Sequence, residues 1–356
     1  MPACTSLPQV PASAGHPSRK DRFMADKIRW GILSTARINS ALLGPIRHSA
    51  RSELVAVASR DLERARAYAA QERIPKAYGS YEELLADPDV DVIYNPLPNA
   101  LHAEWTVKAA DAGKHVLCEK PITVSIEELD QVEAAARLNG VTIFEAFMYL
   151  HHPQTRRALA LIQEGRLGQV QQVNSWFHFY LPPENAQNIR LNAALSGGSL
   201  WDVGVYPNSM AIVMIGAGVP VAVWASQIEG ESGVDVSMRG QMHFANGAVA
   251  QISSSFRTPF REAAYIVGDK GILHIPEPWK PGLRGQDSRM IFTGLDGSQE
   301  EIITQAVDPY LCEVQAMEAC VLDGADPVVP LSLSRQFLRS VLALYRSART
   351  GELVRP

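Results

Sequence analysis

The sequence lacks the features that mark several classes of protein. None of its apolar runs reaches the eighteen residues typical of a membrane-spanning helix. Its 33 basic and 38 acidic residues give a formal charge of −5, so it has no cationic excess for nucleic acid. Its four cysteines form no CxxC motif and no cluster with histidine, which favours a reducing compartment. We therefore expect a cytoplasmic protein whose partners include neither membrane nor nucleic acid.

The first 26 residues also lack the apolar segment of a secretory signal. Their proline, serine and alanine content predicts a disordered tail, and Met24 offers an alternative start. The rest of the 356-residue chain is long enough for two domains, and its 46% hydrophobic content is that of a globular protein.

Residues 27–148 predict an α/β domain. Segments of helical period alternate with short runs rich in valine and isoleucine, and they begin at capping residues: Asp61 and the boxes Ser80-x-x-Glu83 and Ser125-x-x-Glu128. The apolar runs are 28–33, 53–59, 90–95, 114–119 and 141–147. Runs this apolar indicate a doubly wound parallel sheet, a Rossmann domain with ligands beyond the carboxyl ends of its strands.

Residues 149–356 predict an α+β domain with an open, mostly antiparallel sheet. Apolar and polar residues alternate in several strands from 170 to 269, and Asn246-Gly247 indicates a hairpin in a meander-like order. Helical period returns at 308–323 and 332–349. An uncovered sheet face suits self-association, so we expect a homodimer or homotetramer.

The turn after the first strand is poor in glycine for a dinucleotide site. In G-x-G-x-x-G the first glycine permits a sharp bend, and here that position is Gly31. Ser34 and Ala36 are small residues that could approximately meet the steric demands of the other two glycines. This turn alone is equally consistent with a plain structural turn.

The second strand ends at Ser59-Arg60 rather than at an acid. A hydroxyl and a guanidinium there suit a ribose 2′-phosphate, which favours NADP, while NAD stays open because Asp61 is adjacent. Arg37 is a second cation near the turn. Both arginines could instead simply face water.

Two further segments carry chemistry. Glu119-Lys120-Pro121 ends the fourth predicted strand, so Lys120 points into the ligand crevice and Pro121 fixes the turn, with a cis bond as one option. In "GGSLWDVGVYPNSM", Asp202 and Tyr206 share one face if the segment is helical. A proline follows Tyr206 directly and predicts a kink there.

Taken together, "AGKHV", "CEKPIT", "EAFMYLHHPQ" and "GGSLWDVGVYP" resemble the glucose-fructose oxidoreductase / inositol dehydrogenase (Gfo/Idh/MocA) family. The tyrosine in D-x-G-x-Y is similar to its D-xylose dehydrogenase and dihydrodiol dehydrogenase branch. The resemblance implies that Lys120 lies beside nicotinamide and substrate, and that Asp202 and Tyr206 line the substrate pocket. The cofactor set that we expect from the turns and the resemblance is Gly31, Ser34, Thr35, Ala36, Arg37, Ile38, Ser59, Arg60, Asn95, Leu97, Asn99, His102, Glu119 and Lys120.

The resemblance implies an oxidoreductase that exchanges hydride with a sugar or related cyclic polyol, and the end of the second strand favours NADP as its cofactor. Oxidising a hydroxyl needs a base, and the ordinary tyrosine pKa of about 10 is too high at neutral pH. We expect Lys120 to lower the pKa of Tyr206, the acid/base, while Asp202 orients a substrate hydroxyl. The alternatives are a ketoreductase of nucleotide-linked deoxysugars and a non-catalytic NAD(P)-binding sensor or scaffold.

Other polar and aromatic residues carry weaker expectations. His151, His152 and His178 lack the spacing of a zinc site, so we expect structural roles and no metal. The aromatic run around His178 suits sheet packing or a sugar site. Arg190, in the irregular segment 182–197, is expected near the active site.

Overall fold

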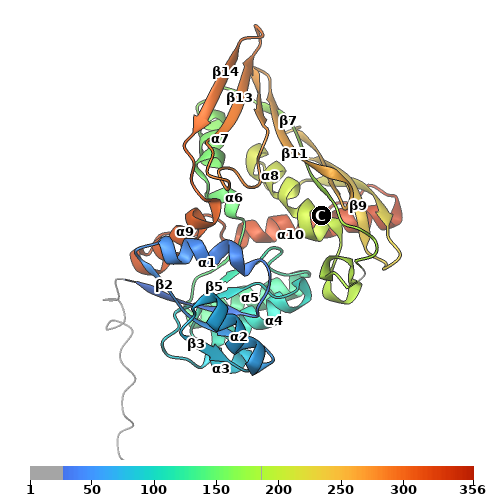
Figure 1. Cartoon of the computed structure of the whole chain (residues 1–356). Coiled ribbons are helices and arrows are strands. Elements are labelled where there is room, and N and C mark those ends of the chain that lie inside the picture. Colours follow the sequence, from blue (N-terminus) through green and yellow to red (C-terminus); the bar gives the residue numbers. More distant parts are fainter. Residues whose placement is uncertain (1–26, 186) are drawn as a thin grey trace, which may run out of the picture.

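A computed structural model of the chain describes residues 27–185 and 187–356, so the expected tail and Met24 lie outside the described residues. Two sheets form the body of the molecule, the smaller one in the N-terminal part and the larger one in the C-terminal part (Figure 1). The α/β class and the two-sheet architecture predicted from the sequence are thus confirmed.

The N-terminal sheet has six parallel strands in the order β3-β2-β1-β4-β5-β6. Its strands are β1 (Ile28–Leu33), β2 (Ser52–Ala58), β3 (Lys76–Tyr78), β4 (Val92–Asn95), β5 (His115–Cys118) and β6 (Ile143–Glu145). The central strands are buried almost throughout, as their unbroken apolar runs predicted. The sequence did not indicate β3, because this half-buried edge strand of three residues has no apolar run.

Helices begin where the capping residues predicted. The side chain of Asp61 accepts a hydrogen bond from the main-chain N–H of Arg64 at 2.9 Å, and Ser80 and Ser125 do the same at their helices. The helices of this part are α1 (Asn39–His48), α2 (Leu62–Glu72), α3 (Tyr81–Leu85), the 3₁₀ turn η2 (Asn99–Leu101), α4 (His102–Asp111), α5 (Ile126–Asn139) and α6 (Met148–His151).

The C-terminal sheet has eight strands in the order β14-β13-β12-β11-β7-β10-β9-β8. They are β7 (Val170–Tyr180), β8 (Ala222–Glu229), β9 (Asp235–His243), β10 (Val249–Ser255), β11 (Arg257–Gly268), β12 (Gly271–Ile275), β13 (Ser288–Gly294) and β14 (Gln299–Thr304). The hairpin at Asn246-Gly247 joins β9 to β10 as predicted. The order is no simple meander, because β7 inserts between β10 and β11 and pairs with β10 in parallel.

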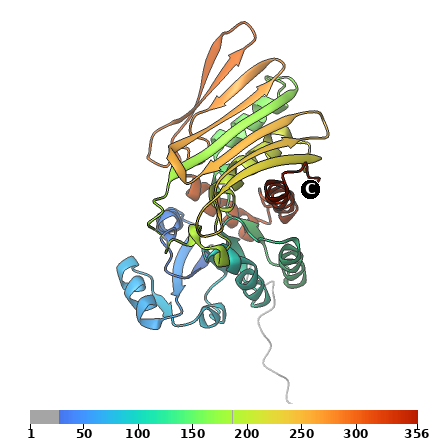
Figure 2. The same ribbon diagram turned by 90° about the vertical axis from the view of Figure 1, so that its right-hand side faces the viewer.

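Helices cover only one face of this larger sheet. Helix α8 (Val205–Ile215) packs on β7 and β10, α10 (Leu331–Thr350) packs on β8, and α7 (Pro153–Gln163) contacts β13. In the described part of the chain no helix lies on the other face, which is turned toward the viewer in Figure 2.

The C-terminal helices return to the first domain. Helix α9 (Pro309–Asp323) packs on α1 and β1, and Arg51 of the first domain forms an ion pair of 2.6 Å with Asp323. Helix α10 contacts α5 and β6. The smaller sheet is thus built from residues 28–145 and the larger one from residues 170–304, while both late helices contact the first domain.

Candidate active site

Lys120, Arg190 and Asp202 meet at the carboxyl end of β5. The Lys120 Nζ donates to the main-chain oxygen of Asp202 at 2.6 Å and lies 3.4 Å from its Oδ1. The Arg190 Nε donates to the other carboxylate oxygen at 2.6 Å. Burial raises the pKa of Asp202, but the charges of Lys120 and Arg190 outweigh it, so this pKa stays below its ordinary value. Asp202 is therefore a paired carboxylate.

The backbone around Lys120 has the geometry that its sequence suggested. The Lys120-Pro121 peptide bond is cis. Asp202, which accepts the hydrogen bond from Lys120, lies in a single π-helical turn, Leu200–Gly204. This turn comes directly before α8. Helix α8 continues through Tyr206 and Pro207, so the kink expected at Tyr206 is replaced by this wider turn before the proline.

Tyr206 lies beside Lys120, but its hydroxyl is poorly solvated. Only 5% of the residue is exposed, its hydroxyl lies 3.6 Å from the Met148 Sδ, and the Lys120 Nζ lies 5.3 Å from its ring centroid. Burial raises the pKa of Tyr206 well above 10, with further raising contributions from Tyr310 and Glu119. The expectation that Lys120 lowers this pKa is wrong for this structure, because Lys120 faces the ring and hydrogen-bonds Asp202.

The nucleotide turn has a different register from the one read in the sequence. Ser34, not Gly31, has the left-handed conformation that the first glycine of the fingerprint normally supplies, with φ 70°. A Cβ on Gly31 would lie 2.9 Å from Val90 Cγ1, so Gly31 is required by core packing and not by the bend. Counting from Ser34, the fingerprint positions are Ser34, Ala36 and Asn39, and Asn39 is a fully buried residue that sequence reasoning missed.

This turn can hold the diphosphate of a dinucleotide. Within residues 27–185 and 187–356, the main-chain N–H groups of Thr35, Ala36, Arg37 and Ile38 donate to no protein acceptor. They precede α1, whose N-terminus favours an anion. The residues present therefore fit a dinucleotide.

Cations surround the outer end of this turn. Arg37 and Arg60 are exposed, as a phosphate contact requires, whereas Ser59 is buried. Arg64, which sequence reasoning missed, donates from its Nε to Thr35 Oγ1 at 2.8 Å.

Three of the expected cofactor contacts turn inward instead. Asn95 is fully buried and donates to the main-chain oxygen of His102 and to Thr106 Oγ1, each at 3.1 Å. Both ring nitrogens of His102 lie 2.6 Å from main-chain oxygens, of Leu97 and Pro121. These side chains position the loop and the cis-proline turn, and Leu97 is itself buried.

Asn99 and Glu119 are partly buried, and both have protein partners. The Asn99 Nδ2 donates to the main-chain oxygen of Ser196 at 2.8 Å, which links η2 to the segment that carries Arg190. Around it lie two 3₁₀ turns, η3 (Ile189–Leu191) and η4 (Ala193–Leu195). Glu119 accepts a hydrogen bond from the Tyr94 hydroxyl at 2.8 Å.

Sequence reasoning missed three groups that the tertiary structure adds to this site. Lys280 comes from the segment 276–287 between β12 and β13, and the charges of Lys120, Glu119 and Asp202 act on it. Tyr310 and Glu313 come from α9, where Glu313 is fully buried and both its carboxylate oxygens lack a partner within the described chain. No local motif marked them, because each reaches the site only when distant segments pack together.

The histidines have structural surroundings. His151 is buried in α6, and burial lowers its pKa to about 3. His152 accepts from the main-chain N–H of Gln154 at the start of α7, and His178 lies 2.9 Å from Ser253 Oγ. Within the described residues, no group of three histidine, cysteine or acidic side chains is arranged to hold a metal. No described helix combines the length and apolarity needed to cross a membrane.

Comparison with known proteins gives matches along nearly the whole described chain. The D-xylose 1-dehydrogenase (NADP(+)) 2 of Haloferax volcanii is 40% identical over 329 residues, which are 91% of this chain and 98% of that protein. The dTDP-3,4-didehydro-2,6-dideoxy-alpha-D-glucose 3-reductase of Actinomadura kijaniata is 31% identical, covering 92% and 96%. The crystal structure of aldose-aldose oxidoreductase from Caulobacter crescentus with glycerol superposes with a TM-score of 0.84 at 27% identity, covering 93% and 100%.

Family models match both parts of the fold. Residues 28–147 match the oxidoreductase family with an NAD-binding Rossmann fold, and residues 155–274 match the GFO/IDH/MocA C-terminal domain. With the parallel sheet, the turn that fits a diphosphate and the lysine at the end of β5, these matches show that the chain belongs to the GFO/IDH/MocA oxidoreductase family.

Proposed function

We propose that this protein is an NADP-dependent oxidoreductase that interconverts a hydroxyl and a carbonyl group of an aldose or related cyclic polyol. The observation that carries the proposal is the convergence of Lys120, Asp202 and Tyr206 at the carboxyl end of β5. The sugar oxidoreductases among the relatives support the substrate class.

In this proposal Tyr206 is the acid/base and Lys120 holds the reacting oxygen. The turn at residues 34–38 would hold a nicotinamide dinucleotide by its diphosphate, and that cofactor would supply or accept the hydride. A buried tyrosine with a raised pKa stays protonated, so Tyr206 is suited to donate a proton to a carbonyl oxygen during reduction. Lys120 keeps its Nζ at the cleft because the main chain of Asp202 fixes it. Both carboxylate oxygens of Asp202 are engaged, so we assign it chiefly to positioning Lys120 and Arg190.

The preference for NADP rests on the end of β2. No acidic side chain takes the position of Ser59 or Arg60, and Arg60 is exposed where it can pair with a 2′-phosphate. Asp61 is the remaining acid that could bind the ribose 2′-hydroxyl of NAD, but its carboxylate already caps the N-terminus of α2. The H. volcanii relative is named as an NADP(+) enzyme, which supports the same choice.

Reduction of a nucleotide-linked deoxysugar is the second candidate, supported by the 3-reductase relative and the protonated state of Tyr206. The chain has both Lys120 and Tyr206, which a non-catalytic sensor or scaffold does not need. This disfavours the sensor alternative.

The test is a fluorescence titration with NADPH and NADH, followed by turnover of aldoses, inositols, trans-dihydrodiols and a dTDP-linked ketosugar. We expect tighter binding of NADPH and turnover of aldoses that Tyr206→Phe abolishes while NADPH still binds. Failure to bind either nucleotide would refute the proposal, and wild-type turnover by Tyr206→Phe would refute the role of Tyr206.

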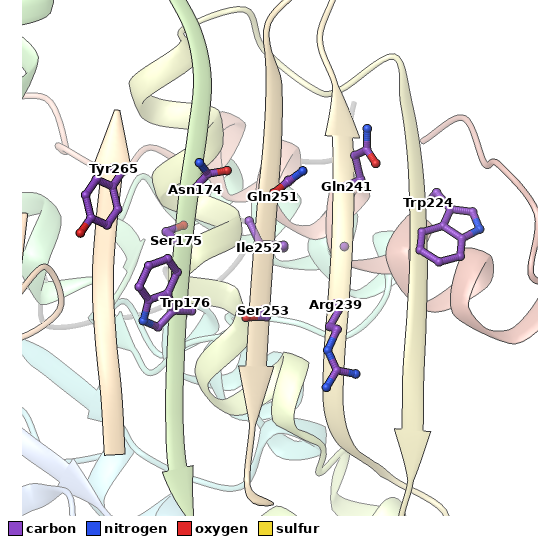
Figure 3. A pocket seen from close by; sticks show the side chains of 11 residues that line it. Asn174, Ser175, Trp176, Trp224, Arg239, Gln241, Gln251, Ile252, Ser253 and Tyr265 are labelled. Atoms are coloured by element: carbon purple, nitrogen blue, oxygen red, sulfur yellow. The ribbon is translucent and has the colours of Figure 1, made fainter. Parts of the chain in front are cut away.

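We also propose that two copies associate through the open face of the large sheet. Apolar side chains recur across it: Trp224, Ile228, Ile272 and Ile303 are 45%, 52%, 39% and 63% exposed. Figure 3 shows side chains that stand on this face. They line a hollow of about 590 Å³. A face this wide and partly apolar, uncovered within the described chain, suits a second copy better than water.

We further propose that the protein is cytoplasmic. Three cysteines are free thiols in this structure: Cys118, Cys312 and Cys320. Free thiols are typical of cytoplasmic proteins, because that compartment keeps cysteines reduced.

A further inference from the structure

The segment 276–287 is fixed in place beside Tyr206 by one tryptophan. Trp279 is fully buried, its Nε1 donates to the main-chain oxygen of Trp176 at 3.1 Å, and its ring centroid lies 5.7 Å from that of Tyr206. The same ring stacks on Phe177 at 6.1 Å. Prolines precede and follow the Trp279-Lys280 pair and restrict its backbone. The position of Lys280 relative to the site is therefore set by a rigid anchor.

Lys280 is an exposed residue whose ammonium group has no protein partner within the described chain. The residue is exposed, and among the described residues its side chain forms no hydrogen bond or ion pair. Although the residue is exposed, partial desolvation and the charge of Lys120 lower the pKa of Lys280, while Glu119 and Glu262 oppose this shift. Lys280 thus lies among the charges of the site with its donors unused.

Two side chains of β11 lie near Lys280. Glu262 pairs with Phe177 in the sheet, so its side chain lies on the face that α8 covers. Burial and the neighbouring Glu277 raise the pKa of Glu262 to about 7, while Lys280 opposes the shift. Phe260 is 64% exposed, although its ring contacts Phe177 edge-on at 6.2 Å. The Phe177 ring in turn lies 5.5 Å from that of Tyr206.

We propose that Phe260, Glu262 and Lys280 form a subsite for the part of an uncharged sugar that lies away from the reacting carbon, an inference that rests on the proposed function. The exposed phenyl ring packs on the C–H face of the sugar. The ammonium group donates to hydroxyl oxygens, and the carboxylate accepts from hydroxyl protons.

The charges of this subsite favour a free sugar over a nucleotide-linked one. Lys280 and Arg284 act on Glu262 together with Glu277, so this cluster, with Glu262 included, holds two cations and two carboxyl groups. A diphosphate needs a surplus of cations, which this arrangement does not supply. A sugar hydroxyl group both donates and accepts hydrogen bonds, so it can bind an ammonium group and a carboxylate at the same time.

The test compares Lys280→Met with Lys270→Met, a control at an exposed lysine in the β11–β12 turn. Steady-state kinetics with NADP(H) use aldoses of six, five and three carbons. Removing a charged donor from a substrate hydroxyl costs about 10- to 100-fold in affinity. For Lys280→Met we expect KM to rise by that factor for hexoses and pentoses, with kcat changed less than threefold. Glyceraldehyde is too short to reach the subsite, so its KM should change less than twofold.

A binding measurement separates this inference from the proposed reaction. Sugar binding to the NADP complex is followed by tryptophan fluorescence, because Trp279 adjoins the subsite. Weaker pentose binding by Lys280→Met supports the subsite even if the wild type turns over no aldose, a result that would refute the reaction alone. Unchanged pentose binding, an equal loss for all chain lengths, or an effect of Lys270→Met would overturn the subsite. Tighter binding of a dTDP-linked sugar than of any free aldose would overturn its preference for uncharged sugars.

Discussion

The Nζ of Lys120 donates a hydrogen bond to the main-chain oxygen of Asp202 at 2.6 Å, joining residues 82 positions apart. Lys120 follows a strand of the parallel sheet, and Asp202 lies in the π-helical turn that leads into α8 of the other domain. The reacting groups therefore hold their geometry only while the two domains stay packed. This contact also explains why Lys120 lies over the Tyr206 ring, where it does not reach the hydroxyl.

The raised pKa of Tyr206 predicts a pH profile. Because kcat/KM reports the ionisation of the free enzyme, sugar oxidation should keep increasing up to at least pH 10. Carbonyl reduction needs the protonated phenol and should show no loss from this group below pH 10. Initial rates from pH 6 to 10 check both directions, with Tyr180→Phe, an exposed tyrosine, as a control. A plateau in oxidation near pH 7 would show that Lys120 does lower this pKa.

Asp202→Asn should weaken the fold in a pH-dependent way. The pKa of Asp202 is lower in the folded protein than in the unfolded chain, where it is about 3.9. The ionised carboxylate therefore makes its full contribution to the free energy of unfolding above about pH 3.9, and this contribution is lost as the pH falls through the pKa of the folded state. Breaking this largely buried pair should cost about 3 kcal/mol of unfolding free energy at pH 7. Urea unfolding at pH 7 and pH 3 measures the difference, which should shrink at pH 3. Asp130→Asn removes an exposed partner of Arg335 and should cost under about 1 kcal/mol.

Ser34→Gly should stabilise the protein and retain nucleotide binding. Ser34 has φ 70°, a conformation that a residue with a Cβ adopts at a cost, so glycine should add about 1 kcal/mol. Arg73→Gly is the matched control, because Arg73 has φ 54° at the end of α2. Both variants should raise Tm in thermal unfolding. Destabilisation by Ser34→Gly would mean that the Ser34 side chain supports the turn.

Arg60→Ala should weaken NADPH binding selectively. Loss of a charge-assisted contact with the 2′-phosphate should raise the Kd for NADPH about 10- to 100-fold and leave that for NADH within about twofold. Fluorescence titration of both nucleotides measures this. Arg66→Ala alters another exposed arginine of the same segment, one that pairs with Glu63, and should change neither Kd. Equal weakening of both nucleotides would assign Arg60 to another part of the cofactor.

Trp224→Arg tests self-association. Trp224 lies on β8, the outermost strand of this sheet, and a charge placed there within an interface between two copies of the open face should shift the protein toward monomers. Sedimentation velocity measures the species, and Leu138→Arg on α5, at an 83% exposed residue away from this sheet, should leave them unchanged. A wild-type monomer at micromolar concentration would contradict the proposed dimer.

The sequence alone determined what depends on local pattern. Unbroken apolar runs need burial on both faces, so they identified the parallel sheet, and the serine and aspartate caps located helix starts. The motif at 119–121 located the lysine at a strand end.

Only the tertiary structure decided what depends on distant segments. The raised pKa of Tyr206 follows from its burial, with further raising contributions from Tyr310 and Glu119. Ser34 takes the role of the first glycine because of its backbone conformation, which a count of glycines does not reveal. The sequence led us to expect Arg190 near the site, but only the structure gave its partner, Asp202, and Lys280 joins the site from a segment without a recognisable motif. Electrostatic free energies depend on distance and burial in three dimensions, so sequence spacing could place Lys120 and Tyr206 in one cleft but could not set their ionisation.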